Sequence, residues 1–122
     1  MKQRTRDFAL RVVKLAAALP RERGADVFAR QMIRSASSTA ANYRAACRSR
    51  SRAEFIAKLG IVEEEADETS FWIGMTRDSG LVKPQQVRDL LTEADEIVAM
   101  IVASRKTTRA NAASDRPGRR AN

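Results

Sequence analysis

The sequence contains no histidine, one cysteine, and only three prolines and five glycines among its 122 residues. Without histidine, the commonest general base, serine–histidine pairs and the Glu-x-x-His ligands of di-iron bundles are all excluded. A single cysteine cannot form a disulfide within the chain, which suits a reducing cytoplasm. No stretch approaches the roughly 20 apolar residues that span a bilayer, and the first residues lack the apolar core of a secretory signal. These absences predict a cytoplasmic, non-enzymatic protein without a cofactor and without a membrane segment.

The residues that are abundant favour helices. Ala, Arg, Glu, Leu, Ile and Val dominate, and the chain is long enough for one domain with a single core. Its net charge is +8, from 23 Lys and Arg against 15 Asp and Glu. Residues 105–122 hold six of the basic residues and one acid, so the preceding part of the chain is nearly balanced.

Apolar residues recur at helical spacing in four segments, which predict helices at about residues 4–19, 26–48, 52–78 and 84–106. Ser51 and Glu54 have the form of a capping box at the start of the third helix. Gly80 suits the left-handed residue that ends this helix, and Pro84 suits the first position of the next. The third helix carries a bundle seam, spaced by four and three residues: Phe55, Leu59, Val62, Ala66, Thr69 and Ile73.

These segments predict an all-α protein. About three residues join the second helix to the third, so these two helices must lie side by side and antiparallel. The small polar segment 35–39 should remain helical and let a neighbouring helix come close. We expect an antiparallel up-down-up-down four-helix bundle over residues 1–106. Residues 107–122 are polar and basic, contain Pro117 and Gly118, and should form a disordered tail.

The candidates for chemistry have simpler structural explanations. Residues 63–68 form an acidic run, but consecutive residues splay around a helix, so most of these acids should face solvent or form salt bridges. A metal site is the weaker alternative, and we predict none. Cys47 lies on the apolar face of the second helix and should be a small buried residue. Trp72 adjoins the seam, where an edge of the core or a subunit contact is favoured over a base-stacking platform.

A basic cluster at the end of the second helix is the most informative surface feature. It comprises Arg44, Arg48, Arg50, Arg52 and Lys58, and the window 44–58 holds only one acid, Glu54. Arg44 and Arg48 share a helical face because they lie four residues apart. Guanidinium groups match phosphate oxygens, so the cluster predicts salt-sensitive binding to RNA or DNA backbone. The alternative is that these cations pair with acids of the third and fourth helices, within or between subunits.

Several motifs also carry a family resemblance over residues 5–104. They are Gln31-Met32-Ile33-Arg34, Ala36, Ala41-Asn42 and Ser51-x-x-Glu54-Phe55. With them the sequence resembles the four helix bundle protein family. That family includes proteins encoded in intervening sequences of 23S ribosomal RNA genes and the accessory protein of diversity-generating retroelements. The resemblance implies a ring-shaped homo-oligomer, notably a pentamer, with a basic surface, and an association with nucleic acid and reverse transcriptase in the retroelement members.

The sequence departs from that family pattern at two places. Ala45-Ala46 stands where many members have Glu-Gly, and Ala40 stands where many have proline. Both changes straighten and strengthen the helix, and a family role tied to that glutamate is therefore not carried over to this sequence. Two functions therefore remain open. One is an oligomeric adaptor that binds nucleic acid through the basic cluster. The other is a structural or protein-interaction module whose charged faces join subunits or dock a partner protein.

Overall fold

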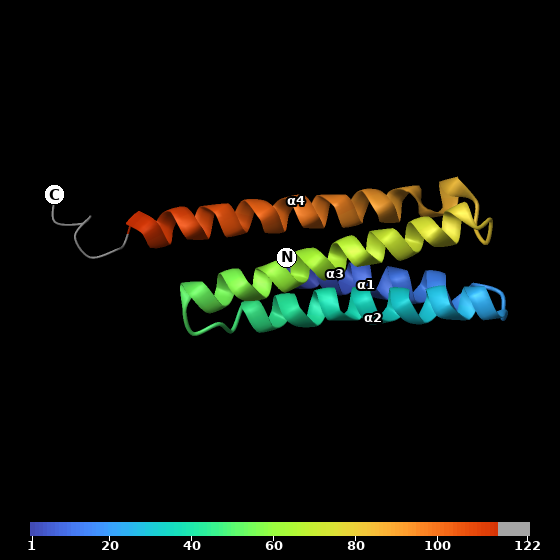
Figure 1. Ribbon diagram of the computed structural model, residues 1–122, viewed down its shortest axis with the longest axis horizontal. Coiled ribbons are helices and arrows are strands. Elements are labelled where there is room, and N and C mark those ends of the chain that lie inside the picture. The colour runs from blue at the N-terminus through green and yellow to red at the C-terminus, as the bar shows by residue number, and fades with distance from the viewer. Residues whose placement is uncertain (115–122) are drawn as a thin grey trace.

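The computed structural model describes residues 1–114, and over this range the chain forms four α-helices and no strand. They are α1 (Lys2–Ala17), α2 (Arg23–Ala46), α3 (Arg52–Asp78) and α4 (Pro84–Ser114). Consecutive helices run in opposite directions and pack as neighbours, α1 on α2, α2 on α3 and α3 on α4 (Figure 1). The predicted all-α four-helix fold is confirmed.

Both ends of α3 follow from local sequence. The Ser51 hydroxyl accepts a hydrogen bond from the Glu54 backbone N–H at 3.1 Å, which satisfies one of the free donors of the first turn. At the other end Gly80 has a φ of 83°. This left-handed residue lets the Leu81 N–H donate to the Thr76 carbonyl at 3.2 Å, which is the longer bond of a Schellman motif. The predicted bounds of α3 are therefore correct.

The core is a continuous cluster contributed by all four helices. The seam of α3 points inward as predicted, since Leu59, Val62, Ala66 and Ile73 are fully buried. Phe55, at the start of the seam, is half-buried against the same cluster. Within residues 1–114 no helix combines the length and the apolar character that crossing a membrane requires. The other large buried side chains are Phe8, Val12, Met32, Val87, Ile97 and Ile101.

Buried hydroxyl groups replace part of the apolar contact between α2 and α3. The Thr69 hydroxyl donates to the Ser35 hydroxyl at 2.8 Å, and Ser35 in turn donates to the Gln31 carbonyl at 2.8 Å. Thr39 and Thr76 are also fully buried and donate to carbonyls of their own helices. Because each of these groups has a partner, the small polar segment remains helical, as predicted.

The fourth helix is longer than the sequence indicated. It continues through residues 107–114, which the composition assigned to the tail. This stretch contains alanines and no proline or glycine, so nothing in it breaks a helix. The Thr108 hydroxyl donates to the Ser104 carbonyl at 2.8 Å, and Arg52 of α3 donates to the Asn111 carbonyl at 3.1 Å. The remainder of the predicted disordered tail, residues 115–122, lies outside the described residues.

α1 is the shortest helix and covers only part of α4. It has 16 residues, whereas α4 has 31. Near the start of α1, the Arg4 guanidinium donates to both carboxylate oxygens of Glu93 at 2.8 and 2.7 Å and to Glu96 at 2.7 Å. The hydrogen bonds that Arg4 donates to the Glu93 carboxylate lower the pKa of Glu93 and raise the pKa of Arg4. The N-terminal end of α1 therefore meets the middle of α4, and α1 does not extend along its last turns.

Candidate nucleic-acid interface

The predicted basic cluster surrounds the turn between α2 and α3. Arg44 lies in the last turn of α2, where the partial negative charge of the helix C-terminus favours a cation. Arg48 and Arg50 follow in the turn, which the Ser51 cap closes. Lys58 lies on α3 near its beginning. The cluster is thus held by two helix ends that the local sequence fixes.

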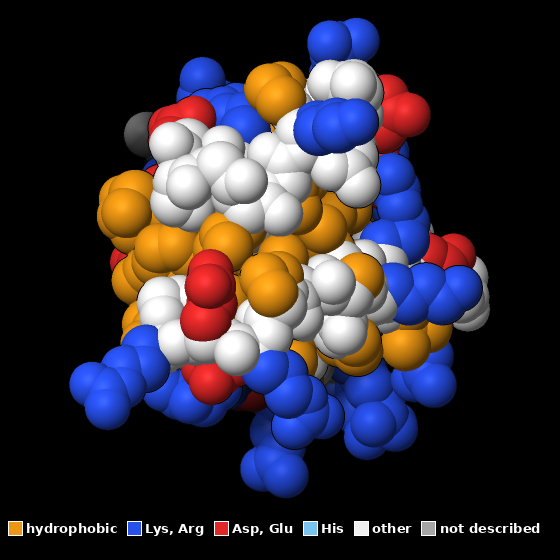
Figure 2. Space-filling view, turned by 90° about the vertical axis from the view of Figure 1, so that its right-hand side faces the viewer, with side chains coloured by type: hydrophobic (Ala, Val, Ile, Leu, Met, Phe, Trp, Pro, Cys, Tyr) orange, Lys and Arg blue, Asp and Glu red, His pale blue; other side chains and the backbone are white. Residues whose placement is uncertain are grey.

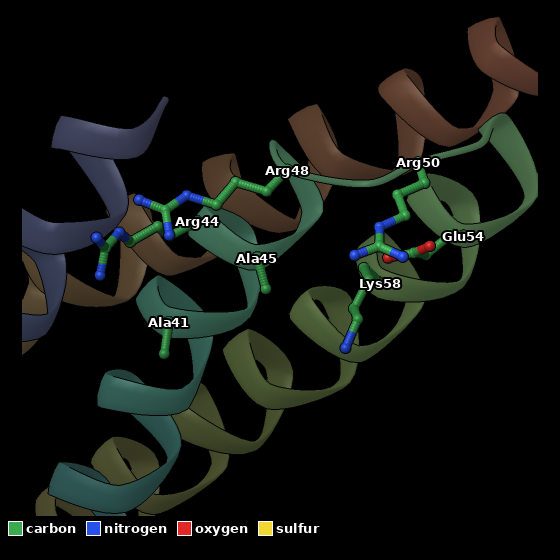
Figure 3. Close-up of a pocket in the computed structure, with 7 residues that line it drawn as sticks. All are labelled: Ala41, Arg44, Ala45, Arg48, Arg50, Glu54 and Lys58. Atoms are coloured by element: carbon green, nitrogen blue, oxygen red, sulfur yellow. The ribbon is translucent and has the colours of Figure 1, made fainter.

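Four of the five predicted residues line one shallow groove between α2 and α3. Its volume is about 520 Å³, and it is lined by Ala41, Arg44, Ala45, Arg48, Arg50, Glu54 and Lys58. In Figure 3 the side chains of Arg44 and Arg48 extend along one side of α2, whereas Arg50 and Lys58 lie over α3. Ala41 and Ala45 are between them. The groove therefore has cations on two sides and small apolar side chains in the middle.

The cations of this groove share one nearby carboxylate, Glu54, and take no part in the interhelical ion pairs of residues 1–114. Among the described residues, Arg44, Arg48, Arg50 and Lys58 form no salt bridge. The interhelical ion pairs lie elsewhere: Arg4 with Glu93 and Glu96, Arg34 with Glu65 and Glu68, and Arg105 with Glu63. Glu54 is the one carboxylate that lines the groove, so four cations face one anion.

Arg52 is placed differently from the other four. Its side chain reaches α4, where Nη1 donates to the Asn111 carbonyl at 3.1 Å. It lines a smaller hollow of about 310 Å³ with Cys47 and Phe55, and it is not part of the groove around Ala41 and Ala45. The sequence placed Arg52 in the same cluster because it lies next to the turn. In the folded chain it belongs to the α3–α4 side.

Two further cations that the sequence did not single out extend the basic surface onto α1. A second groove of about 490 Å³ runs between α1 and α2, and Lys2 and Arg6 line one part of it. Both grooves are lined by Ala41 and Arg44, so they are continuous across the outer face of α2. We call the combined set the basic track: Lys2, Arg6, Arg44, Arg48, Arg50 and Lys58. The sequence shows that Lys2 and Arg6 are four residues apart and so share a helical face. Their position beside Arg44 depends on the register of α1 against α2 and is not visible in the sequence.

The acidic run of α3 forms a charged outer face, in agreement with the sequence. Glu63 accepts a hydrogen bond from Arg105 at 2.6 Å, and Glu65 accepts one from Arg34 at 3.0 Å. Glu64 and Asp67 are exposed. In the range 1–114, no group of His, Cys, Asp or Glu side chains has the arrangement of a metal site. The acids therefore serve as partners for arginines and as a solvated surface.

Cys47 is exposed, contrary to the prediction that it would be buried. It is the residue that follows the last helical position of α2. Cys47 lines the shallow hollow beside Arg52 and Phe55, which leaves its side chain accessible. Tyr43 lies one turn before Cys47. Its pKa is raised mainly by partial burial and secondly by the nearby Cys47 thiol.

Trp72 lies at an edge of the core and far from the basic track. Its ring packs against Phe28 at a centroid distance of 5.9 Å and edge-on against Phe71 at 5.0 Å. The indole N–H donates to Glu68 at 3.2 Å. Trp72 is 14 residues from Lys58 along the same helix, which corresponds to roughly 21 Å. The preferred interpretation as an edge of the core is therefore supported, and Trp72 does not border the basic track.

Comparison with known proteins identifies similar chains. The sequence model of the 23S rRNA-intervening sequence protein family matches residues 1–103. A crystal structure of a protein of unknown function from the S23 ribosomal protein family of Bacteroides thetaiotaomicron VPI-5482 is also similar, with 32% sequence identity and a TM-score of 0.81. The similarity covers 86% of this chain and 97% of that one. No curated protein matches.

Proposed function

Since the chain belongs to the family of 23S rRNA-intervening sequence proteins, we propose that it is a non-enzymatic adaptor that binds the phosphate backbone of RNA or DNA through the basic track. The observation that carries this proposal is the groove between α2 and α3. Four cations line it with a single carboxylate, and none of them forms a salt bridge with the described acids. Cations that form no salt bridge with the described acids are available to an external polyanion.

The physical basis of binding is the release of counterions from phosphates. Each phosphate of a duplex that the protein neutralises contributes about −0.9 to the slope of log affinity against log salt concentration. If Arg44, Arg48, Arg50 and Lys58 each contact one phosphate, affinity falls on the order of a hundredfold between about 50 and 200 mM salt. Arginine can also donate two parallel hydrogen bonds to one phosphate, which orients the backbone in the groove.

The test is a salt titration of binding to labelled nucleic acid, followed by fluorescence anisotropy. A variant with Arg44, Arg48, Arg50 and Lys58 all changed to Ala should lose most of its affinity and most of its salt dependence. The matched control changes the same number of exposed cations outside the track: Lys14, Arg21, Arg30 and Lys83. A control of this kind is needed because basic side chains are not confined to the track. Figure 2 shows the end of the bundle opposite the α2–α3 turn, and basic side chains also project around its rim.

Two outcomes would contradict nucleic-acid binding through the track. One is the absence of binding at low salt by the unchanged protein. The other is an equal loss of affinity in the track variant and the control variant, because net charge alone would then explain it.

Self-association is a second candidate function, and two exposed apolar side chains favour it. Leu10 on α1 and Phe71 on α3 are 53% and 56% exposed, the largest values among the exposed large hydrophobic residues described. Leu10 has the cations Arg6 and Lys14 four residues before and after it. The exposed acids Glu64 and Asp67 lie seven and four residues before Phe71. The two faces are therefore complementary in charge and similar in apolar character, which favours a second copy of this chain as the partner.

Sedimentation velocity tests this second candidate. Phe71→Arg places a cation on the acidic face and should lower the sedimenting mass, whereas Val27→Arg changes an apolar residue of α2 that is 41% exposed and should not. A monomeric unchanged protein at its highest soluble concentration would exclude self-association. Equal masses for the two variants would exclude the proposed face.

A further inference from the structure

No aromatic side chain of residues 1–114 lines either groove of the basic track, and Phe55 lines the neighbouring hollow that Arg50 and Arg52 share. The chain has four Phe, one Tyr and one Trp. Phe8 is buried, and Phe28, Tyr43, Phe55 and Trp72 are partly buried against the core. Phe71 is the one exposed aromatic residue described. It is 13 residues from Lys58 on α3, or roughly 20 Å along the helix.

The absence of aromatic residues from the two grooves bears on the kind of nucleic acid that the track can bind. Proteins that bind single strands combine a basic groove with aromatic rings on which the unpaired bases stack. Neither groove of the track is lined by an aromatic ring. Unpaired bases would therefore find no aromatic ring to stack on there, only the planes of arginine guanidinium groups, and contacts to phosphates dominate.

A duplex offers such a surface more phosphates than a single strand does. Both strands of a double helix contribute charge, about one per 1.7 Å of axis, and the bases are already stacked on one another. The lining residues of the two grooves include six cations and one carboxylate, Glu54. A ligand recognised by charge density alone is therefore bound more tightly as a duplex.

The arrangement of the cations agrees with this preference. Ala41 and Ala45 lie between two pairs of cations (Figure 3). One pair is Arg44 on α2 and Arg48 just after it, and the other is Arg50 and Lys58, which lie over α3. The small side chains between them let a sugar–phosphate backbone come close, and the methyl groups of alanine offer no hydrogen bond to a base edge. The contacts available are thus those that position a backbone, and not those that identify a sequence.

We infer that the basic track takes double-stranded nucleic acid in preference to single strands and does so without reading the sequence. This inference rests on the proposed function, since it specifies the ligand of the same site. The shared chemistry is the paired phosphate backbone, which an RNA duplex and a DNA duplex both supply.

The experiment compares four probes of equal length with the unchanged full chain. They are an RNA duplex, a DNA duplex of the same sequence, and unstructured oligouridine and oligothymidine single strands. At about 100 mM salt we expect at least one duplex to bind roughly tenfold more tightly than its single-stranded counterpart, with a steeper salt dependence. A second duplex of scrambled sequence should bind equally well.

Three results would overturn the inference. The first is single strands that bind as tightly as duplexes or more tightly. The second is a clear preference for one duplex sequence over its scrambled form. The third is a loss of single-strand binding in Phe71→Ala that shows this ring to be a stacking platform of the binding site. Failure of the proposed function has a different signature, because then none of the four probes binds at low salt.

Discussion

The Arg34 guanidinium on α2 donates to the Glu65 carboxylate on α3 at 3.0 Å. Arg34 also pairs with Glu68, which accepts a hydrogen bond from the Trp72 indole. Ten residues later on α2, Arg44 has no such partner among the described residues and lies in both grooves of the basic track. One helix therefore carries arginines of two kinds, those used to join helices and those left on the surface.

Removing Arg34 should affect stability and not ligand binding. Arg34→Ala breaks the ion pairs to α3, and because Arg34 is about half exposed we expect a cost of roughly 0.5–1 kcal/mol. Its affinity for nucleic acid should equal that of the unchanged protein. Arg44→Ala should instead weaken binding, and its effect on chemical denaturation should be limited to the lost interaction of one cation with the C-terminus of α2. Equal effects of the two changes on binding would show that net charge, and not the track, governs affinity.

Arg6 provides the sharpest test of the extension onto α1. It lies outside the cluster that the sequence indicated, yet it lines the groove that Arg44 shares. Arg6→Ala should weaken duplex binding several-fold and reduce the salt slope by about one, as expected for one lost phosphate contact. Arg30→Ala, which removes an exposed cation of α2 outside both grooves, should leave the slope unchanged. A salt slope unaffected by Arg6→Ala would confine the site to the α2–α3 turn.

The two glycines at helix ends should respond to alanine in opposite ways. Gly80 has a φ of 83°, where a Cβ is strained, so Gly80→Ala should lower the free energy of unfolding by about 1 kcal/mol or more. Gly24 lies in the first turn of α2 without a positive φ, and a Cβ added to it would meet no other atom within 4 Å. Gly24→Ala should therefore be neutral or stabilising, because alanine favours helix. Urea denaturation of both variants measures this difference, and a stabilised Gly80→Ala would contradict the assignment of the Schellman motif.

Stability should fall in acid partly through Glu93. Hydrogen bonds from Arg4 lower the pKa of Glu93 below its ordinary value of 4.5, with smaller support from the charge of Arg11. Because the folded pKa is the lower one, the pair stabilises the fold above pH 4.5 and this contribution is lost as the pH falls through the folded pKa. Glu93→Gln should thus lower Tm at neutral pH. In acid, the difference in Tm between this variant and the unchanged protein should become smaller.

The control for this pH dependence is Glu64→Gln, which changes an exposed acid of α3 that forms no salt bridge with the described residues. Its Tm should follow that of the unchanged protein at every pH. A difference between Glu93→Gln and the unchanged protein that stays constant from neutral to acid pH would mean that Glu93 acts through packing and not through its charge.

Local signals predicted the individual helices well. The cap at Ser51 and the left-handed Gly80 define α3 correctly because both act through bonds between residues close in the chain. The alternation of four and three residues along α3 likewise identified the buried seam. The end of α4 was missed because residues 107–114 are polar like the residues that follow them, and the contact from Arg52 to Asn111 is not visible in the sequence.

Side-chain placement around the turn was predicted less well. The exposure of Cys47 and the direction of Arg52 depend on how the helices pack around the turn. The sequence showed the basic cluster between Arg44 and Lys58. It did not show which arginines of the chain form salt bridges and which line the groove. Which carboxylate an arginine meets depends on the register between helices, and several registers bury the same apolar stripe.

The sequence by itself determined that this protein is four amphipathic helices with a basic turn, because helical periodicity, caps and composition are local properties. Only the tertiary structure decided that Lys2 and Arg6 continue the basic surface around Arg44. It also decided that Arg34 and Arg105 form salt bridges with acids of α3. The reason is physical: charge neutralisation requires two groups to come within a few ångströms, and for residues far apart in the chain that proximity is set by helix packing.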